Sequence, residues 1–318
     1  MRARLQLIYN QQRGYLKQTE KPEPGLPTPV LIGAGVLLAG AAWALGTLAV
    51  SWFATHPIRL PILKINRDDD PRWENVTFPT EDGLEISGWF APAADARGTV
   101  ILCHGHPMNR MEMLPWARLL HHAGFHTLLF DFRAHGQSEG NLCSIGYHEV
   151  QDLLGAVEYL SARPDTEGLP IGAYGHSMGG AVTLMTAARE PRLAAVATHG
   201  AFASLQSAIV QRGRSVLGPA GGIVTHPMVF WSKQWMEIDP IVVSPFDVID
   251  QIAPRPVLLM HGAHDRIINP DDAHALYQAA QQPKELRIWP RSWHTTISSH
   301  ERAAYEATLL DFFRTNLK

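Results

Sequence analysis

The stretch Gly175-His176-Ser177-Met178-Gly179 decides the fold of this 318-residue chain. It follows a short apolar run, 169–174, that is typical of a buried strand, and it precedes a run, 180–189, that is typical of a helix. A G-x-S-x-G pentapeptide between a strand and a helix predicts a nucleophile elbow, a sharp turn that holds the serine hydroxyl clear of the sheet. Gly175 and Gly179 are needed there because side chains would strike the neighbouring strand and helix.

A serine hydroxyl is a weak nucleophile unless a base removes its proton and an acid orients that base. In a fold with this elbow the three residues follow one another as Ser, Asp or Glu, then His. Asp265 comes just after the apolar run 257–262, and His294 lies in the loop after an alternating segment, 285–289. Both follow strand ends at the edge where Ser177 lies. Ser177, Asp265 and His294 therefore form a candidate catalytic triad.

Four segments resemble the α/β-hydrolase family, in particular its single-domain, esterase-like or serine-aminopeptidase-like serine hydrolases. These segments are 102–106, 131–138, the elbow and 259–265. The resemblance runs from about Glu74 to the C-terminus. It implies that Ser177 is the nucleophile, Asp265 the orienting acid and His294 the base. The serine nucleophile excludes the family's aspartate-based branches, the dehalogenases and epoxide hydrolases.

The same resemblance implies an oxyanion hole built from two backbone N–H groups, those of Met178 and His106. Met178 begins the helix after the elbow, where the helix dipole also favours negative charge. His106 follows the apolar run 100–105. Its loop reads His-Gly-His-Pro over 104–107 rather than the glycine-rich form of many lipases, which argues against a lipase of that branch. The catalytic histidine of relatives usually follows a small or glycine-rich turn, whereas Arg-Ser-Trp precedes His294.

Other polar residues near the expected site have alternative interpretations. Asp131 also follows a strand and could compete for the acid role, but we interpret it as a structural residue that holds the loop 133–136. Histidines from several strand ends suggest a metal, yet they lack a fixed ligand spacing such as H-E-x-x-H. We therefore predict neither a metal nor an organic cofactor. The histidines concerned are His104, His106, His176, His261 and His264.

The alternation of strands and helices predicts an α/β protein built on a mostly parallel sheet. The resemblance implies that it has the α/β-hydrolase fold. We expect a mostly parallel, eight-stranded sheet with helices on both faces and a small cap, at about 202–250, between strands 6 and 7. The expected strands are 75–79, 85–91, 99–104, 126–131, 170–175, 194–199, 256–261 and 285–289. The expected helices are 111–123, 147–162, 178–189, 270–281 and 299–315. The cap is either ordinary helix packing or a partly mobile lid with an apolar wall.

The segment 30–53 contains 24 residues without charge and is apolar on all sides. As a helix it would span roughly 36 Å at about 1.5 Å per residue, enough for a bilayer core of about 30 Å. A cleaved signal peptide is the rival interpretation, because Ala42-Trp43-Ala44 resembles a cleavage site. A polar lead of 29 residues is long for a signal peptide, so we prefer an uncleaved, single-pass anchor.

Composition places few limits on the compartment. Basic residues flank the span on both sides, so the side of the catalytic domain stays uncertain, with a slight preference for an extracytoplasmic one. Cys103 and Cys143 are the two cysteines, and their expected positions do not suggest a disulfide framework. The net charge of −3 gives no electrostatic case for nucleic acid.

These patterns predict a membrane-anchored serine hydrolase that cleaves small-molecule esters, thioesters or amides, with lipid-derived esters as one candidate class. The expected parts are a tail (1–29), a transmembrane helix (30–53), a linker (54–73) and the hydrolase domain (74–318). The alternatives are an acyltransferase, a non-catalytic scaffold or a small-peptide peptidase. A peptidase would need carboxylates for a free N-terminus, and Glu237 and Asp239 are candidates.

Overall fold

The computed structural model describes residues 28–63, 72–236 and 238–318. The chain divides into two compact units, Met1–Gly46 and Thr47–Lys318. Helix α2 (Thr28–Thr55) runs through the boundary between them. The division therefore assigns the last turns of the predicted span to the hydrolase unit. Glu237, most of the predicted tail and part of the predicted linker lie outside the described residues.

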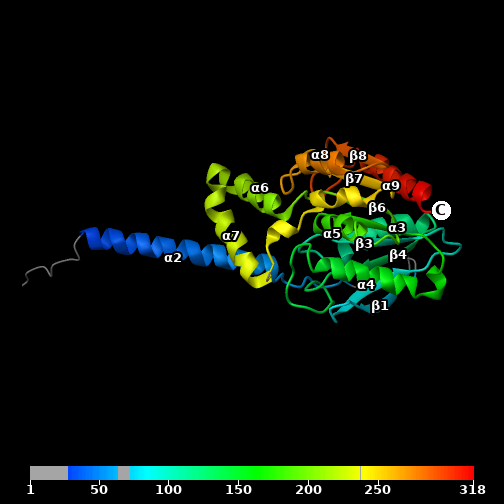
Figure 1. The fold of residues 1–318 in the computed structure, drawn as a ribbon, viewed down its shortest axis with the longest axis horizontal. Coiled ribbons are helices and arrows are strands. Elements are labelled where there is room, and N and C mark those ends of the chain that lie inside the picture. Colours follow the sequence, from blue (N-terminus) through cyan, green and yellow to red (C-terminus); the bar gives the residue numbers. More distant parts are fainter. Residues whose placement is uncertain (1–27, 64–71, 237) are drawn as a thin grey trace, which may run out of the picture. The chain divides into compact units, whose positions relative to one another are not determined.

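One sheet of eight strands forms the centre of the hydrolase unit, in the order β1-β2-β4-β3-β5-β6-β7-β8 (Figure 1). The pairs β1–β2 and β2–β4 are antiparallel, and the other pairs are parallel. The α/β-hydrolase fold predicted from the sequence is thereby confirmed. The strands are β1 (Glu74–Pro79), β2 (Glu85–Ala91), β3 (Thr99–Cys103), β4 (His126–Phe130), β5 (Ile171–His176), β6 (Leu193–His199), β7 (Val257–Gly262) and β8 (Lys284–Trp289).

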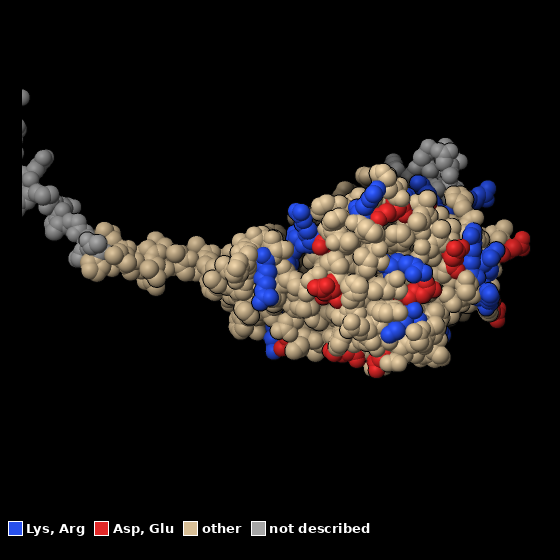
Figure 2. Space-filling view, turned by 90° about the horizontal axis from the view of Figure 1, so that it is seen from above, with Lys and Arg blue, Asp and Glu red and all other residues tan. Residues whose placement is uncertain are grey.

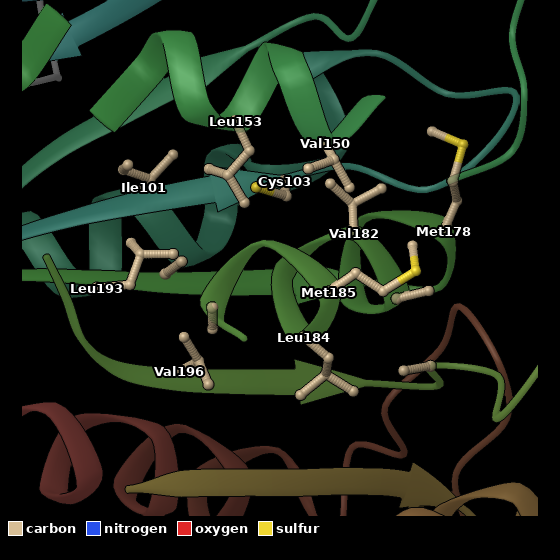
Figure 3. Close-up of a cluster of buried hydrophobic side chains, with 14 of the residues drawn as sticks. Ile101, Cys103, Val150, Leu153, Met178, Val182, Leu184, Met185, Leu193 and Val196 are labelled. Carbon is tan, nitrogen blue, oxygen red and sulfur yellow. The ribbon is translucent and has the colours of Figure 1, made fainter. Parts of the chain in front are cut away.

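Helices cover both faces of the sheet, and each face has its own apolar core. One core joins the sheet to helices α4 (Glu149–Ser161), α5 (Met178–Ala187) and α8 (Pro270–Ala279). Figure 3 shows part of it, where side chains of α4 and α5 meet those of β3 and β6. The other core joins the sheet to α3 (Leu114–His122) and α9 (Arg302–Asn316). This layering fixes the ends of the strands, where the candidate site residues lie.

Three helices begin later than the sequence predicts. The segment Arg110–Met113 is a 3₁₀ turn capped by Asn109, and α3 begins only at Leu114, with a proline in its first turn. Helix α4 begins at Glu149 rather than at residue 147. The buried Glu149 carboxylate accepts hydrogen bonds from Ser144 and Gly146 and so ends the preceding loop there. Helix α9 begins at Arg302 rather than at residue 299.

Two helices form the cap between β6 and β7. Helix α6 (Leu205–Leu217) is capped by Ser204, whose hydroxyl accepts a hydrogen bond from Ser207 N. After a 3₁₀ turn, Gly218–Ala220, the chain continues as α7 (Gly221–Met236). Three short 3₁₀ turns, Pro240–Val242, Pro245–Asp247 and Ile249–Ile252, then lead to β7.

Helix α2 is long and apolar enough to span a membrane or to be a signal sequence. Its segment Pro29–Thr55 contains an 18-residue window with a mean hydropathy of 1.9 and has no charged residue. The residues that follow it contact the sheet-bearing part of the hydrolase unit: Arg59 donates hydrogen bonds to backbone carbonyls of Gly136 and Gly140, and Asn109 donates one to Leu60 O. The described start of the predicted linker is therefore attached to the hydrolase unit. On the face seen in Figure 2, acidic and basic side chains are intermixed over the body of the molecule.

Candidate active site

Ser177 lies in the sharp turn between β5 and α5, with a backbone φ of 53° and ψ of −118°. A side chain at either elbow glycine would meet backbone atoms. A Cβ at Gly175 would lie 2.2 Å from the Gly179 carbonyl oxygen, and a Cβ at Gly179 would lie 2.3 Å from the Cys103 carbonyl oxygen. The elbow therefore needs glycine at both positions.

The structure brings together the three residues of the predicted triad. His294 Nε2 lies 2.8 Å from Ser177 Oγ, and His294 Nδ1 lies 2.6 Å from Asp265 Oδ2. His294 and Asp265 are 6% and 8% exposed, whereas Ser177 is half-buried and open to a cavity. The hydrogen bonds form a continuous chain from hydroxyl to carboxylate, which is the arrangement needed to move the serine proton.

Asp265 is held in its ionised form by several donors. Its Oδ1 accepts hydrogen bonds from the backbone N–H groups of Ile267 and Ile268, at 2.8 and 2.9 Å. Nε2 of the buried His261 lies 3.0 Å from its Oδ2. Burial opposes ionisation, but the hydrogen bonds from His261 and His294 outweigh it and lower the pKa of Asp265. The carboxylate can therefore keep the His294 proton on Nδ1.

His294 is held in its neutral form. Burial lowers its pKa, and the opposing effect of Asp265 does not restore the ordinary value. With Nδ1–H donated to Asp265, the lone pair of Nε2 faces Ser177 Oγ. This is the protonation state in which an imidazole can accept the hydroxyl proton.

The two predicted oxyanion donors, His106 and Met178, line the same cavity as Ser177. Met178 is the first residue of α5, and its side chain is buried. His106 follows β3 and Gly105, whose N–H donates to Glu112 Oε2 at 2.6 Å. Two backbone N–H groups at these positions can stabilise an oxyanion formed next to Ser177.

Comparison with known proteins places this chain in a family. The model of the serine aminopeptidase S33 family matches residues 94–239. An uncharacterized protein of Bacillus subtilis, YqkD, is 30% identical over 243 residues, which cover 74% of this chain and 77% of that protein. The chain belongs to the α/β-hydrolase family.

Another curated protein is similar to this α/β hydrolase in sequence, and solved structures share its fold. The uncharacterized protein YfhR of Escherichia coli is 28% identical over 78% of this chain and 83% of its own length. An esterase from Pyrococcus furiosus has a similar structure, with a TM-score of 0.69 and 21% identity over 83% of this chain and 99% of that one. The esterase domain of a Rhodothermus marinus protein has a TM-score of 0.56 and 25% identity over 77% and 99%.

Two further residues, His176 and Glu112, contact the candidate site. The sequence patterns indicated His176 only as a candidate metal ligand and did not indicate Glu112. His176 Nδ1 lies 3.0 Å from Glu112 Oε1, and His176 Nε2 lies 2.8 Å from the backbone carbonyl oxygen of His294. Burial would lower the pKa of His176, but Glu112 and the His294 carbonyl outweigh it, and the pKa is raised. Although burial opposes ionisation of Glu112 too, His176 lowers the pKa of that carboxyl to about 2. His176 and Glu112 therefore form a partly buried ion pair.

His106, His135 and Cys143 form a group whose potential ligand atoms lie within 4.8 Å of one another. His135 Nδ1 donates to the Arg133 carbonyl at 2.8 Å, so its Nε2 can accept the Nδ1–H of His106, at 3.2 Å. This hydrogen bond makes His106 Nδ1 and His135 Nε2 partners of each other. Of the histidines considered as ligands from the sequence, only His106 belongs to this group.

The remaining candidates have structural contacts. Asp131 is completely buried, and its carboxylate accepts hydrogen bonds from the backbone N–H groups of Arg110 and Gln137 and from the Arg110 guanidinium. His104 is also buried, and its Nε2 accepts a hydrogen bond from Phe132 N. His264 is exposed and packs its ring against Trp293. None of these contacts involves Ser177.

Proposed function

We propose that this protein is a serine hydrolase that cleaves an ester, thioester or amide through an acyl-enzyme. In this proposal Ser177 is the nucleophile, His294 the general base and Asp265 the acid that orients it. The observation that carries the proposal is the hydrogen-bonded chain from Ser177 Oγ through His294 to Asp265. Membership of the α/β-hydrolase family supports hydrolytic chemistry in general.

The reaction follows from this geometry. His294 Nε2 takes the Ser177 proton while Oγ attacks the carbonyl carbon, and the oxyanion accepts hydrogen bonds from the N–H groups of Met178 and His106. Collapse breaks the bond to the leaving group, which takes the proton from His294. A water molecule then gives its proton to His294 and attacks the acyl-enzyme, which releases the acid and returns the proton to Ser177.

The cavity beside Ser177 favours an ester of an apolar acid over a peptide. Among the described residues that line it, Arg212 carries the only charge. A free peptide N-terminus would need a carboxylate, and a cation would repel it. Asp239, one of the two candidates for that role, is half-buried and paired with Lys233 at 2.7 Å. An acyltransferase would use the same groups, with an alcohol or thiol in place of water.

We further propose that α2 is an uncleaved anchor, with the hydrolase unit on the extracytoplasmic side. Its length and apolar composition support a membrane span but fit a signal sequence equally. The mass of the protein isolated from membranes distinguishes the two. An anchor predicts the full 318-residue mass in the pellet after carbonate extraction. A protein shortened near Ala44 and released into the soluble fraction would contradict it.

Ester hydrolysis tests the catalytic proposal. The full-length protein in detergent should hydrolyse p-nitrophenyl butyrate, and Ser177→Ala or His294→Ala should lower kcat by about 10⁴-fold or more. Asp265→Asn should cost a comparable factor, because the imidazole would then favour the wrong tautomer. New esters formed from added alcohols, or new thioesters formed from added thiols, would identify an acyltransferase. Hydrolysis that survives in Ser177→Ala would refute the proposed nucleophile.

A further inference from the structure

The cavity beside Ser177 extends from the elbow to the underside of the cap. Its volume is about 380 Å³. Ser177, Met178 and His106 lie at one end, and apolar residues of α6 and α7 form most of the wall. Its apolar lining includes Val50, Ala208, Ile209, Val216 and Leu217. A wall of this composition suits a hydrocarbon chain.

The volume of this cavity sets the scale of the chain. An apolar cavity of about 150 Å³ accommodates benzene, which corresponds to roughly 25 Å³ per carbon atom. On that scale a cavity of 380 Å³ holds a chain of roughly 15 carbons at most. Acetate or butyrate would leave most of the apolar wall without contacts, whereas a medium or long acyl chain would fill it.

The mouth of the cavity lies among exposed apolar residues. Val50, Val216 and Leu217 line the cavity and are nevertheless 49%, 65% and 46% exposed. Val50 belongs to the last turns of α2, and the other two end α6. Water is a poor environment for such a rim, whereas the hydrocarbon edge of a membrane is a favourable one.

The cap contacts the end of α2 directly. Ser51 Oγ lies 3.0 Å from Ser232 Oγ and accepts a hydrogen bond from Trp235 Nε1 at 3.2 Å. The rings of Trp52 and Trp235 meet edge to face, with centroids 5.2 Å apart. Tryptophan is enriched where a membrane span meets water. These contacts place α7 beside the end of the apolar helix.

The composition of the cap is suited to the same boundary. Ile223 and Phe230 of α7 are 63% and 55% exposed. Helices α6 and α7 carry the cations Arg212, Arg214 and Lys233 and no carboxylate. In Figure 2 the cap end of the unit is mostly uncharged. Exposed apolar side chains with a few cations are typical of a surface that lies in an anionic membrane interface.

We propose that the substrate is a long-chain acyl ester resident in the membrane, whose chain enters at the rim formed by Val50, Val216 and Leu217. The cap lies in the interface, the chain fills the cavity, and the carbonyl carbon reaches Ser177 Oγ. Attack forms the Ser177 acyl ester and releases the alcohol, and water then releases the fatty acid. This inference rests on the proposed serine hydrolase activity and on the proposed anchor.

Chain-length preference tests the cavity. The full-length protein in lipid vesicles is assayed on p-nitrophenyl esters from acetate to palmitate. Ala208→Phe fills the cavity and should lower the laurate-to-butyrate rate ratio roughly tenfold or more. Ile209→Ala enlarges it and should move the optimum to longer chains. Ala303→Phe, on the exposed face of α9, is the matched control and should leave the ratio unchanged. If the laurate-to-butyrate rate ratio is the same in the wild type and in both cavity variants, the inference is overturned.

Entry from the membrane is tested at the rim. Val216→Glu combined with Leu217→Glu should lower hydrolysis of a vesicle-embedded diacylglycerol more than hydrolysis of dissolved p-nitrophenyl butyrate, by roughly tenfold. Gln206→Glu, an exposed position of α6 outside the cavity lining, is the control for added charge. Equal losses on both substrates would show that the chain does not enter from the bilayer, and would overturn the proposal.

The two proposals can fail separately. The wild-type protein could hydrolyse short esters while the cavity variants leave the chain-length preference unchanged and the rim variant affects both substrates equally. That result would support the proposed function and overturn this inference. If the folded wild-type protein hydrolyses no ester and reacts with no fluorophosphonate, both the proposed function and this inference are overturned.

Discussion

The partly buried ion pair between His176 and Glu112 joins the three loops that carry the candidate site. His176 precedes the nucleophile and donates one ring N–H to Glu112 and the other to the His294 carbonyl. The second Glu112 oxygen accepts the N–H of Gly105, next to His106. Because both ring nitrogens face acceptors, this geometry favours the imidazolium form of His176, in agreement with its raised pKa. One charged pair thus holds the elbow, the base loop and the oxyanion loop together.

Replacing Glu112 by glutamine should therefore impair positioning. We expect kcat to fall by about 10²-fold with little change in KM, since small displacements of reacting groups cost that much. Glu158→Gln, at an exposed carboxylate, is the control and should behave like wild type. An unchanged kcat in Glu112→Gln would mean that the pair does not position the site.

The pH dependence of stability gives a readout of the same pair. Glu112 has a lowered pKa, so its contribution is present above its ordinary value of 4.5 and is lost as pH falls toward about 2. His176 has a raised pKa, so its contribution is present below its ordinary value of 6.5 and is lost as pH rises through the raised pKa. The difference in unfolding free energy between wild type and Glu112→Gln should therefore be largest between these two ordinary values. A difference that grows above pH 7 would contradict the assigned charges.

The fall of kcat/KM at acidic pH should reflect protonation of His294. Because burial lowers its pKa from the ordinary value of 6.5, the base remains neutral in mildly acidic solution. We expect the half-maximum of kcat/KM for a neutral ester to lie below pH 6.5. Since kcat/KM reports groups of the free enzyme, the profile can be measured with p-nitrophenyl butyrate at low concentration. A limb centred above pH 6.5 would assign the proton transfer to another group.

The elbow glycines should tolerate no side chain. In Gly179→Ala the new Cβ would lie 2.3 Å from the Cys103 carbonyl oxygen, and backbone on both sides would have to move. Overpacking of this kind costs about 1–3 kcal/mol or more, measured by urea unfolding. Gly222→Ala, where the nearest atom would lie 3.4 Å away on the His226 ring, is the control and should be neutral or slightly stabilising. Equal stability of the two variants would contradict the geometry of the turn.

Replacement of Asp131 should mainly lower stability, whereas replacement of Asp265 should mainly lower the rate of ester hydrolysis. Asp131 forms a buried ion pair with Arg110 at 2.7 Å, and removal of one partner of such a pair costs about 3–5 kcal/mol. Asp131→Ala should therefore unfold at lower urea, yet its folded fraction should still hydrolyse p-nitrophenyl butyrate. Asp265→Ala should lose hydrolysis even when fully folded. The reverse pattern would make Asp131 the acid.

Local sequence patterns were sufficient for the fold and for the grouping of Ser177, Asp265 and His294. Each of these residues follows a strand, and parallel strands bring their carboxyl ends to one edge. The pairing of Glu112 with His176 joins residues 64 apart and depends on how the loop before α3 packs. A carboxylate between two methionines, Met111 and Met113, was the available signal. The cavity depends on the angle of two cap helices, which no local pattern encodes.

The most direct test of the central proposal is covalent labelling of the full-length protein with a fluorophosphonate, followed by mass spectrometry of its peptides. We predict a single adduct on Ser177 in the wild type, strong loss of labelling in His294→Ala and none in Ser177→Ala. The absence of an adduct on Ser177 in the folded wild-type protein, or labelling that persists in Ser177→Ala, would contradict the proposal that Ser177 is an activated nucleophile.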